Sequence, residues 1–235
     1  MKEPMREIWQ NNADDVVTRS DCTPIDWAPF EERTVLDGRY LLRAIRDTPS
    51  DLADAAEVMR TGFFVIRDTE FDILFQPQGF ALLLGEGARF LKGDKFVLVA
   101  EEVATSKVVS LFLLSISKKQ RNCELVVIAT HENYQSRGLG RELAKAFDEY
   151  IENCGVEMAF VWAAAEHVVT QKLMKELGFV TRAVVPGFYR IYGGEGAYRR
   201  TIEVFMQKFY NEAEKMATSQ LDLLPEAKAL VVPWR

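Results

Sequence analysis

One short stretch of the sequence combines glycines and arginines in an arrangement suited to binding phosphate. It consists of Gln135, Ser136, Arg137, Gly138, Leu139 and Gly140, and it lies between an apolar, strand-like run and an amphipathic, helix-like run. The start of a helix leaves its first N–H groups unpaired and carries a partial positive charge. Glycines at 138 and 140 lack the Cβ atoms that would keep a phosphate away, and Arg137 and Arg141 add positive charge. We therefore predict a pyrophosphate-binding turn at residues 135–140.

Two other phosphate-binding motifs do not fit this stretch. A dinucleotide-binding GxGxxG motif would need a third glycine at position 143, which is Leu143. A P-loop would need Gly-Lys-Ser or Gly-Lys-Thr, which the sequence lacks. The remaining alternative is a helix that begins with glycines only because they allow close packing.

Hydrophobic periodicity predicts the elements that position this turn. Strands are expected at residues 39–46, 96–100, 108–117, 123–130, 158–164, 179–185 and 202–209. A helix is expected after Thr48 and Pro49, and further helices at residues 140–153 and 168–177. Residues 64–93 mix large apolar residues with proline and glycine, so short helices and loops are expected there. This order predicts a mixed α/β sheet with helices packed on it.

Composition sets the broad class of the protein. A chain of 235 residues, 48% hydrophobic and 27% charged, can bury a full core. We expect one domain at residues 37–210, an N-terminal extension at 1–36 and a C-terminal tail at 211–235. A net charge of -6 argues against general nucleic-acid binding and mildly favours cationic substrates.

Targeting signals and cysteine spacing bear on location and partners. The sequence offers no apolar run typical of a membrane span or signal peptide, so we expect no membrane association and a cytoplasmic protein. Cys22, Cys123 and Cys154 have neither paired nor metal-type spacing, which favours free thiols. The apolar end of the tail could dock on the domain or on a second subunit, which leaves a homodimer open.

The pattern Gln-x-x-Gly-x-Gly between a strand and a helix resembles motif A of the GNAT superfamily of acetyl-CoA-dependent N-acetyltransferases. Residues 172–179, Lys-Leu-Met-Lys-Glu-Leu-Gly-Phe, resemble motif B, in which a helix ends in Gly-Phe before the next strand. The resemblance covers residues 39–209, and its specific residues lie between 124 and 179. It implies a mixed, mostly antiparallel sheet flanked by helices, with a splay between the two central strands.

The resemblance also implies acetyl-CoA as cosubstrate. The main chain of Ile128, Ala129 and Thr130 would bind pantetheine, and the amides of residues 135–140 would bind the pyrophosphate. A backbone N–H near Ala129 or Thr130 would stabilise the oxyanion. The asparagine of motif B is replaced by His167, which could still make a hydrogen bond or could instead cap the next helix. With one further histidine, His131, and no HExxH pattern, we expect no metal.

The implied reaction is direct attack by a primary amine on the thioester, for which an alkylammonium must first lose a proton. Glu124 has the spacing of the general base in some members of the superfamily. It could equally be a strand-start charge that faces solvent or pairs with Arg121. The tyrosine that protonates the leaving thiolate in many members is replaced by Met174. The thiolate could take its proton from water, from another tyrosine or from no group of the enzyme. Tyr189 and Tyr192 are the candidate tyrosines, or else they are wall residues.

In this superfamily the first helical region and the loop between the last two strands bind the acceptor. Here these are residues 63–89 and 186–200, and we expect the second to be a mobile lid. In it, Glu195 and the aromatics could hold an ammonium, whereas Arg190, Arg199 and Arg200 could hold a carboxylate. The substitutions in motif B leave a non-catalytic, CoA-binding sensory module as the alternative function. The sequence does not specify whether the acceptor is a small molecule or a protein.

Overall fold

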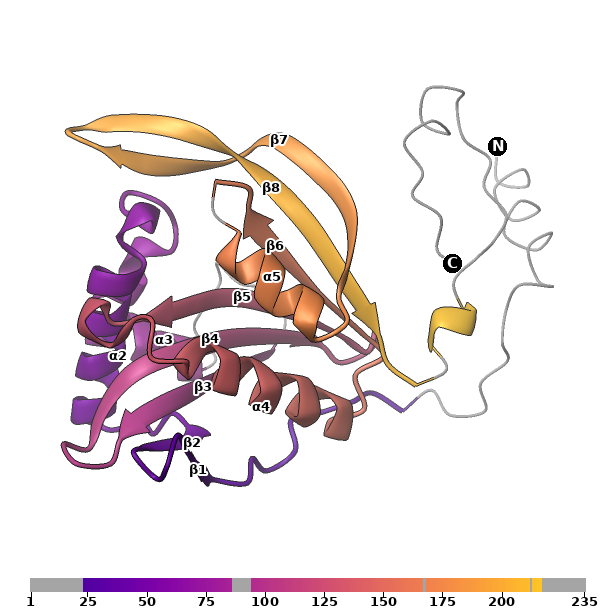
Figure 1. Cartoon of the computed structure of the whole chain (residues 1–235), viewed down its shortest axis with the longest axis horizontal. Coiled ribbons are helices and arrows are strands. Elements are labelled where there is room, and N and C mark those ends of the chain that lie inside the picture. The colour runs from indigo at the N-terminus through magenta and orange to yellow at the C-terminus, as the bar shows by residue number, and fades with distance from the viewer. Residues whose placement is uncertain (1–22, 86–93, 167, 212, 217–235) are drawn as a thin grey trace.

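Eight strands form one mixed sheet, and helices pack on both of its faces (Figure 1). The structure is a computed structural model that describes residues 23–85, 94–166, 168–211 and 213–216. The spatial order of the strands is β1-β2-β3-β4-β5-β6-β8-β7. Only β5 and β6 run parallel, and all other neighbours are antiparallel. The strands are β1 (Arg33–Val35), β2 (Tyr40–Ala44), β3 (Asp94–Glu102), β4 (Lys107–Ser117), β5 (Asn122–Thr130), β6 (Met158–Ala164), β7 (Val180–Gly194) and β8 (Ala197–Phe209).

Each face of the sheet has its own hydrophobic core. On one face pack α2 (Pro49–Gly62) and α3 (Pro77–Leu84), with the short 3-10 helices η2 (Phe64–Ile66) and η3 (Asp72–Phe75). On the other face pack α4 (Leu139–Asn153) and α5 (Val169–Glu176). Two more 3-10 helices, η4 (Glu132–Tyr134) and η5 (Ala213–Met216), lie before α4 and after β8. The expected mixture of short helices and loops after residue 63 is confirmed as far as residue 85.

Local sequence explains why the main helices form where they do. The Thr48 side chain accepts a hydrogen bond from the Asp51 N–H, and Pro49 follows at the first helical position of α2. In α4 the apolar face expected from the sequence is buried against the sheet and includes Leu143 and Phe147. Both helices therefore begin and pack as their sequences predict.

The pairing of β5 with β6 stops before either strand ends. Register pairs run from Asn122 opposite Met158 to Leu125 opposite Val161. Beyond this pair β5 continues to Thr130 and β6 to Ala164 without pairing to each other. A register shift of β5 against β4 occurs at the same level. This opening is the splay that the resemblance implied.

The segment at residues 186–200 is not the loop expected from the sequence. It belongs to a long hairpin in which β7 runs to Gly194 and β8 begins at Ala197. Proline and glycine often interrupt strands, but here they lie at register shifts, where extra residues bulge out of the ladder. The hairpin extends beyond the sheet and reaches η2 on the side of α2 (Figure 1).

The described part of the N-terminal segment packs on the α4 face. The rings of Trp27 and Phe30 lie 6.0 and 5.2 Å from that of Tyr150, whose hydroxyl donates to the Ala28 carbonyl at 2.6 Å. The described part of this segment is thus held on the α4 face by its aromatic residues. Cys22 and the apolar end of the tail lie outside the described residues, and the domain boundaries stay predictions.

Two further expectations concern thiols and membranes. Cys123 and Cys154 are both buried as free thiols. None of the helices in the described part of the chain has the length and apolar character needed to cross a membrane.

Candidate functional site

The N-terminus of α4 has an open backbone turn. Gly138 is the N-cap of this 15-residue helix in the left-handed conformation, with φ at +87°, and Ser136 also has positive φ, at +61°. No side chain caps the helix. A Cβ atom added at Gly140 would meet no heavy atom of the described residues within 4 Å. The N–H groups of Leu139 and Gly140 have no intrahelical acceptor because of their position, so the turn offers donors beside open space.

Two arginines flank this turn. The Arg137 guanidinium lies over the Tyr134 ring, 4.7 Å from its centroid. Arg137 also lines a surface recess of 340 Å³ beside the turn. Arg141 pairs with Glu176 on α5 at 2.8 Å, and both side chains are half exposed. Positive charge therefore stands beside the turn, as expected, although each arginine also has a neighbour in the protein.

The end of β5 that leads into the turn is held from several sides. Thr130 O accepts from Gln135 Nε2 at 3.2 Å, and Ser110 Oγ donates to Ala129 O at 2.9 Å. Gly62 at the end of α2 packs directly on Thr130, because an added Cβ would lie 2.3 Å from the Thr130 oxygen. Packing and hydrogen bonds thus fix this end of the strand.

Ile128, Ala129 and Thr130 all lie beyond the last pair between β5 and β6. The structure therefore places the three expected pantetheine contacts in the splay. Met174, which replaces the tyrosine of motif B, is fully buried in the core between α4, α5 and the sheet. His167 lies outside the described residues.

Glu124 stands on the α2 face of the sheet, at the mouth of the splay. It lies opposite Ser115 on β4 and Phe160 on β6. Burial raises the pKa of its carboxyl above the ordinary value. The expected alternative, an ion pair with Arg121, is wrong, because Arg121 pairs with Glu157 instead.

The structure separates the two candidate tyrosines. Burial first, and then the charges of Glu124, Glu203 and Glu70, raise the pKa of Tyr189 to about 12. This places the Tyr189 hydroxyl within electrostatic reach of Glu124. Tyr192 lies further out on the hairpin, with the Arg67 guanidinium 5.4 Å from its ring centroid.

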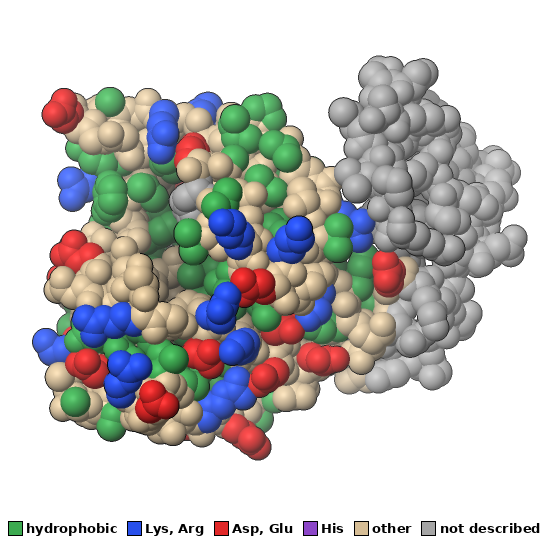
Figure 2. Space-filling view, in the orientation of Figure 1, with side chains coloured by type: hydrophobic (Ala, Val, Ile, Leu, Met, Phe, Trp, Pro, Cys, Tyr) green, Lys and Arg blue, Asp and Glu red, His purple; other side chains and the backbone are tan. Residues whose placement is uncertain are grey.

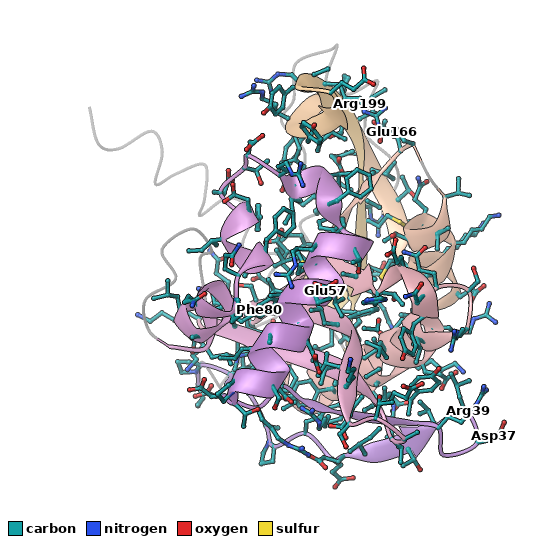
Figure 3. All side chains as sticks on the ribbon, turned by 90° about the vertical axis from the view of Figure 1, so that its left-hand side faces the viewer. Asp37, Arg39, Glu57, Phe80, Glu166 and Arg199 are labelled. Atoms are coloured by element: carbon teal, nitrogen blue, oxygen red, sulfur yellow. The ribbon has the colours of Figure 1, made fainter. Side chains whose placement is uncertain are left out.

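The charged residues expected in a lid are spread along the hairpin. Arg190 lies over the Tyr198 ring at 3.9 Å, and Glu195 occupies the turn at the hairpin tip with φ at +49°. Arg199 lies 3.9 Å from Glu166, at the end of the molecule opposite Asp37 and Arg39 (Figure 3). Arg200 donates to the Gly187 carbonyl at 3.0 Å. These side chains do not converge on one anion site.

An aromatic cluster beside the splay was not recognised in the sequence. It contains Phe160 and Trp162 of β6, Phe188 and Tyr189 of β7, and Phe205 of β8. Phe160 and Trp162 are two residues apart in one strand and therefore share a face. That spacing is the sequence signal from which this part of the cluster could have been predicted. The other half depends on the hairpin. Figure 2 shows hydrophobic side chains gathered around the hollow beneath the hairpin.

In a comparison with protein families, the model described as the acetyltransferase (GNAT) family matches residues 57–179, which is just over half of the chain. Among curated proteins, no sequence relative matches.

Solved structures share the fold at low sequence identity. Protein yncA of Salmonella typhimurium, solved with acetyl-CoA, is 21% identical with a TM-score of 0.57, over 74% of this chain and 95% of that one. Spermidine N-acetyltransferase of Vibrio cholerae is 18% identical with a TM-score of 0.56, over 74% and 96%. Ribosomal-protein-S18-alanine N-acetyltransferase of Escherichia coli is 17% identical with a TM-score of 0.55, over 79% and 99%.

The matched residues contain the open turn, the splayed strands and the helix that ends before Phe179. This chain belongs to the acetyltransferase (GNAT) family.

Proposed function

We propose that this protein transfers an acetyl group from acetyl-CoA to a primary amine by direct attack. One observation carries the proposal: β5 parts from β6 after Leu125 and ends at Thr130, and the chain then enters a turn where Gly140 opens onto space. Acetyl-CoA is a long, thin thioester with a pyrophosphate far from its acetyl group. It fits a gap between two parted strands when that gap leads to a helix N-terminus.

The residues at the slot suit each part of acetyl-CoA. In the proposal, the main chain of Ile128, Ala129 and Thr130 binds pantetheine, and an N–H near Ala129 or Thr130 holds the carbonyl oxygen as it becomes an oxyanion. The amides of residues 135–140 hold the pyrophosphate, with Arg137 and Arg141 beside it. Acetyl-CoA supplies a thioester carbonyl that an amine can attack.

Glu124 and Tyr189 take the two proton transfers in this proposal. Glu124 accepts a proton from the ammonium, and the raised pKa of its carboxyl makes it a stronger base than an ordinary glutamate. The free amine then forms a C–N bond as the C–S bond breaks, and the new amide nitrogen loses its extra proton to solvent, to which Glu124 also releases the proton it accepted. Tyr189 donates its proton to the leaving thiolate and is reprotonated from solvent. Tyr192 is not assigned a role, because its ring contacts Arg67 after η2 and Tyr198 on the outer part of the hairpin.

The test has a binding step and a turnover step. Calorimetry with acetyl-CoA is expected to show one site, and thiol release over a panel of primary amines is expected to show turnover. No binding would exclude both the enzyme and the sensory module. Binding without turnover on any amine would favour the non-catalytic CoA-binding module.

A further inference from the structure

The aromatic cluster of Phe160, Trp162, Phe188, Tyr189 and Phe205 is separate from both hydrophobic cores. Its contacts are close: Trp162 stacks on Phe188 with centroids 4.4 Å apart and lies 4.7 Å from Phe205. Phe188 meets Tyr189 edge-on at 4.7 Å. The rings of the cluster therefore pack on one another.

This cluster lies on a part of the α2 face beyond the strands that α2 contacts, as far as the described residues show. Phe160 is directly opposite Glu124, and Trp162 follows two residues later on the same face of β6. On this face α2 contacts β4 and β5, whereas α5 contacts β6 and β8 from the other side. Phe188 and Tyr189 each remain 38% exposed. Exposed aromatics grouped next to a cofactor slot indicate a surface that a ligand covers.

The backbone of the hairpin is shaped to present this surface. Gly187 has φ at +72°, a conformation that favours glycine, and it lies in the register shift between Pro186 and Arg190. The Tyr189 N–H donates to Thr201 Oγ1 at 3.2 Å. This bulge brings Phe188 over Trp162, so the cluster is built by a specific distortion of β7.

Charge defines one end of the cluster. Phe160 stands directly opposite Glu124, so the aromatic surface ends at a carboxylate at the mouth of the splay. Glu124 is also one of three carboxylates, with Glu203 and Glu70, whose charges help to raise the pKa of Tyr189. Of the three arginines at residues 186–200, Arg199 lies 3.9 Å from Glu166, and Arg190 and Arg200 have partners on the hairpin itself. A carboxylate beside aromatic faces matches an ammonium group attached to an apolar skeleton.

We propose that the acceptor is a primary amine that carries a flat apolar group, such as an arylalkylamine. The apolar group packs against Trp162 and Phe188 while the amino nitrogen lies between Glu124 and Tyr189. This inference rests on the proposed acetyl transfer and names its substrate class. Sugar amines, polar amino alcohols and lysine side chains lack the group that would cover the cluster.

The test compares 2-phenylethylamine with ethylamine and ethanolamine as acceptors at saturating acetyl-CoA. The phenyl compound is expected to have a kcat/KM at least about tenfold higher, most of it through KM, because aromatic packing strengthens binding. Trp162→Leu and Phe188→Leu are expected to remove most of this preference, because kcat/KM should fall far more for 2-phenylethylamine than for ethylamine. Trp162→Phe should restore part of it. Val184→Ala, an exposed residue on the opposite face of β7, is the matched control.

The two proposals fail in different ways. Absence of acetyl-CoA binding, or of turnover on every amine, contradicts acetyl transfer itself. Turnover with equal or better kcat/KM for ethanolamine, or an unchanged preference in Trp162→Leu, overturns only the acceptor class. If a variant shows no thermal transition, it has not folded and its kinetics cannot be used. The two amines are then titrated into the wild-type protein with CoA bound, and equal affinities for phenylethylamine and ethylamine overturn the inference.

Discussion

Glu124 on β5 stands directly opposite Phe160 on β6, one residue before the last pair that joins these strands. Because cross-strand partners share a face, the carboxylate and the first ring of the aromatic cluster lie side by side at the mouth of the splay. An acceptor amine that follows the aromatic surface would therefore arrive at the carboxylate where the strands part.

Glu124→Gln is expected to lower kcat by about a hundredfold or more, because the amide cannot accept the ammonium proton. Wild-type kcat/KM should fall with decreasing pH along a limb set by the raised pKa of this carboxyl. The measurement is a pH–rate profile by thiol release. Glu166→Gln, which removes an exposed carboxylate near Arg199, is the control. Unchanged turnover in Glu124→Gln would exclude this residue as the base.

The same substitution is expected to stabilise the protein at neutral pH. Because burial raises the folded-state pKa of Glu124, the favourable contribution of its protonated form is fully present below the unfolded pKa. That contribution is lost as pH rises through the folded pKa. Glu124→Gln should therefore have a higher Tm than wild type at pH 7, with the difference shrinking toward pH 4. A lower Tm at pH 7 would contradict the burial argument.

Tyr189→Phe is expected to lower kcat by about tenfold to a hundredfold with little change in KM for acetyl-CoA, because only the leaving thiolate loses a proton donor. With a pKa of about 12, Tyr189 stays protonated to high pH, so it should give no alkaline limb below pH 10 or so. Parallel kinetics on Tyr192→Phe test the assignment. A loss confined to Tyr192→Phe would transfer the role to that residue.

Sequence periodicity was sufficient to predict most of the helices and strands, because each main element buries one continuous face. The apolar residues of α4 and the nearly unbroken run of β4 leave one good arrangement for each element. The turn at Gly138 could be predicted equally well, because its phosphate-binding groups are backbone N–H groups at the start of a helix. Local signals of this kind need no knowledge of distant contacts.

The hairpin and the aromatic cluster could not be predicted in this way. Pro186 and Gly187 have the composition of a loop, and they stay in strand β7 only because β8 pairs on both sides of the bulge. Phe188 reaches Trp162 through that bulge, across residues 26 positions apart in the chain. Such contacts depend on tertiary register, which no local pattern records.

Arg43→Met tests the buried ion network that joins β2, β3 and α2. Arg43 is fully buried, and its guanidinium donates to Asp51 at 2.5 and 2.9 Å and to Glu101 at 2.7 Å. Its removal leaves the buried carboxylates without the guanidinium that they share, with the half-exposed Arg46 still 3.8 Å from Glu101, so we expect a loss of about 3–5 kcal/mol in the free energy of unfolding. Urea unfolding measures this. Arg33→Met, which breaks an exposed pair with Glu149, should cost under about 1 kcal/mol.

Gly140→Ala separates fold from cofactor binding at the turn. An added Cβ there meets no described protein atom within 4 Å and the backbone needs no positive φ, so the methyl group should leave the fold intact. Alanine in a helix is favoured over glycine by up to about 1 kcal/mol, so Tm should stay level or rise. The methyl group would nevertheless occupy the space proposed for the pyrophosphate, and acetyl-CoA affinity should fall about tenfold or more by calorimetry.

Gly138→Ala is expected to change stability in the opposite direction from Gly140→Ala, so the two variants are best compared with each other. Gly138 has φ at +87°, and an alanine forced into the left-handed region costs about 1–2 kcal/mol. Its Cβ would only touch Leu36 at 3.8 Å, so the cost comes from backbone strain and not from a clash. We expect a lower Tm for Gly138→Ala and a level or higher Tm for Gly140→Ala, with weaker acetyl-CoA binding in both. Full affinity in Gly140→Ala would mean that the pyrophosphate does not lie against this turn.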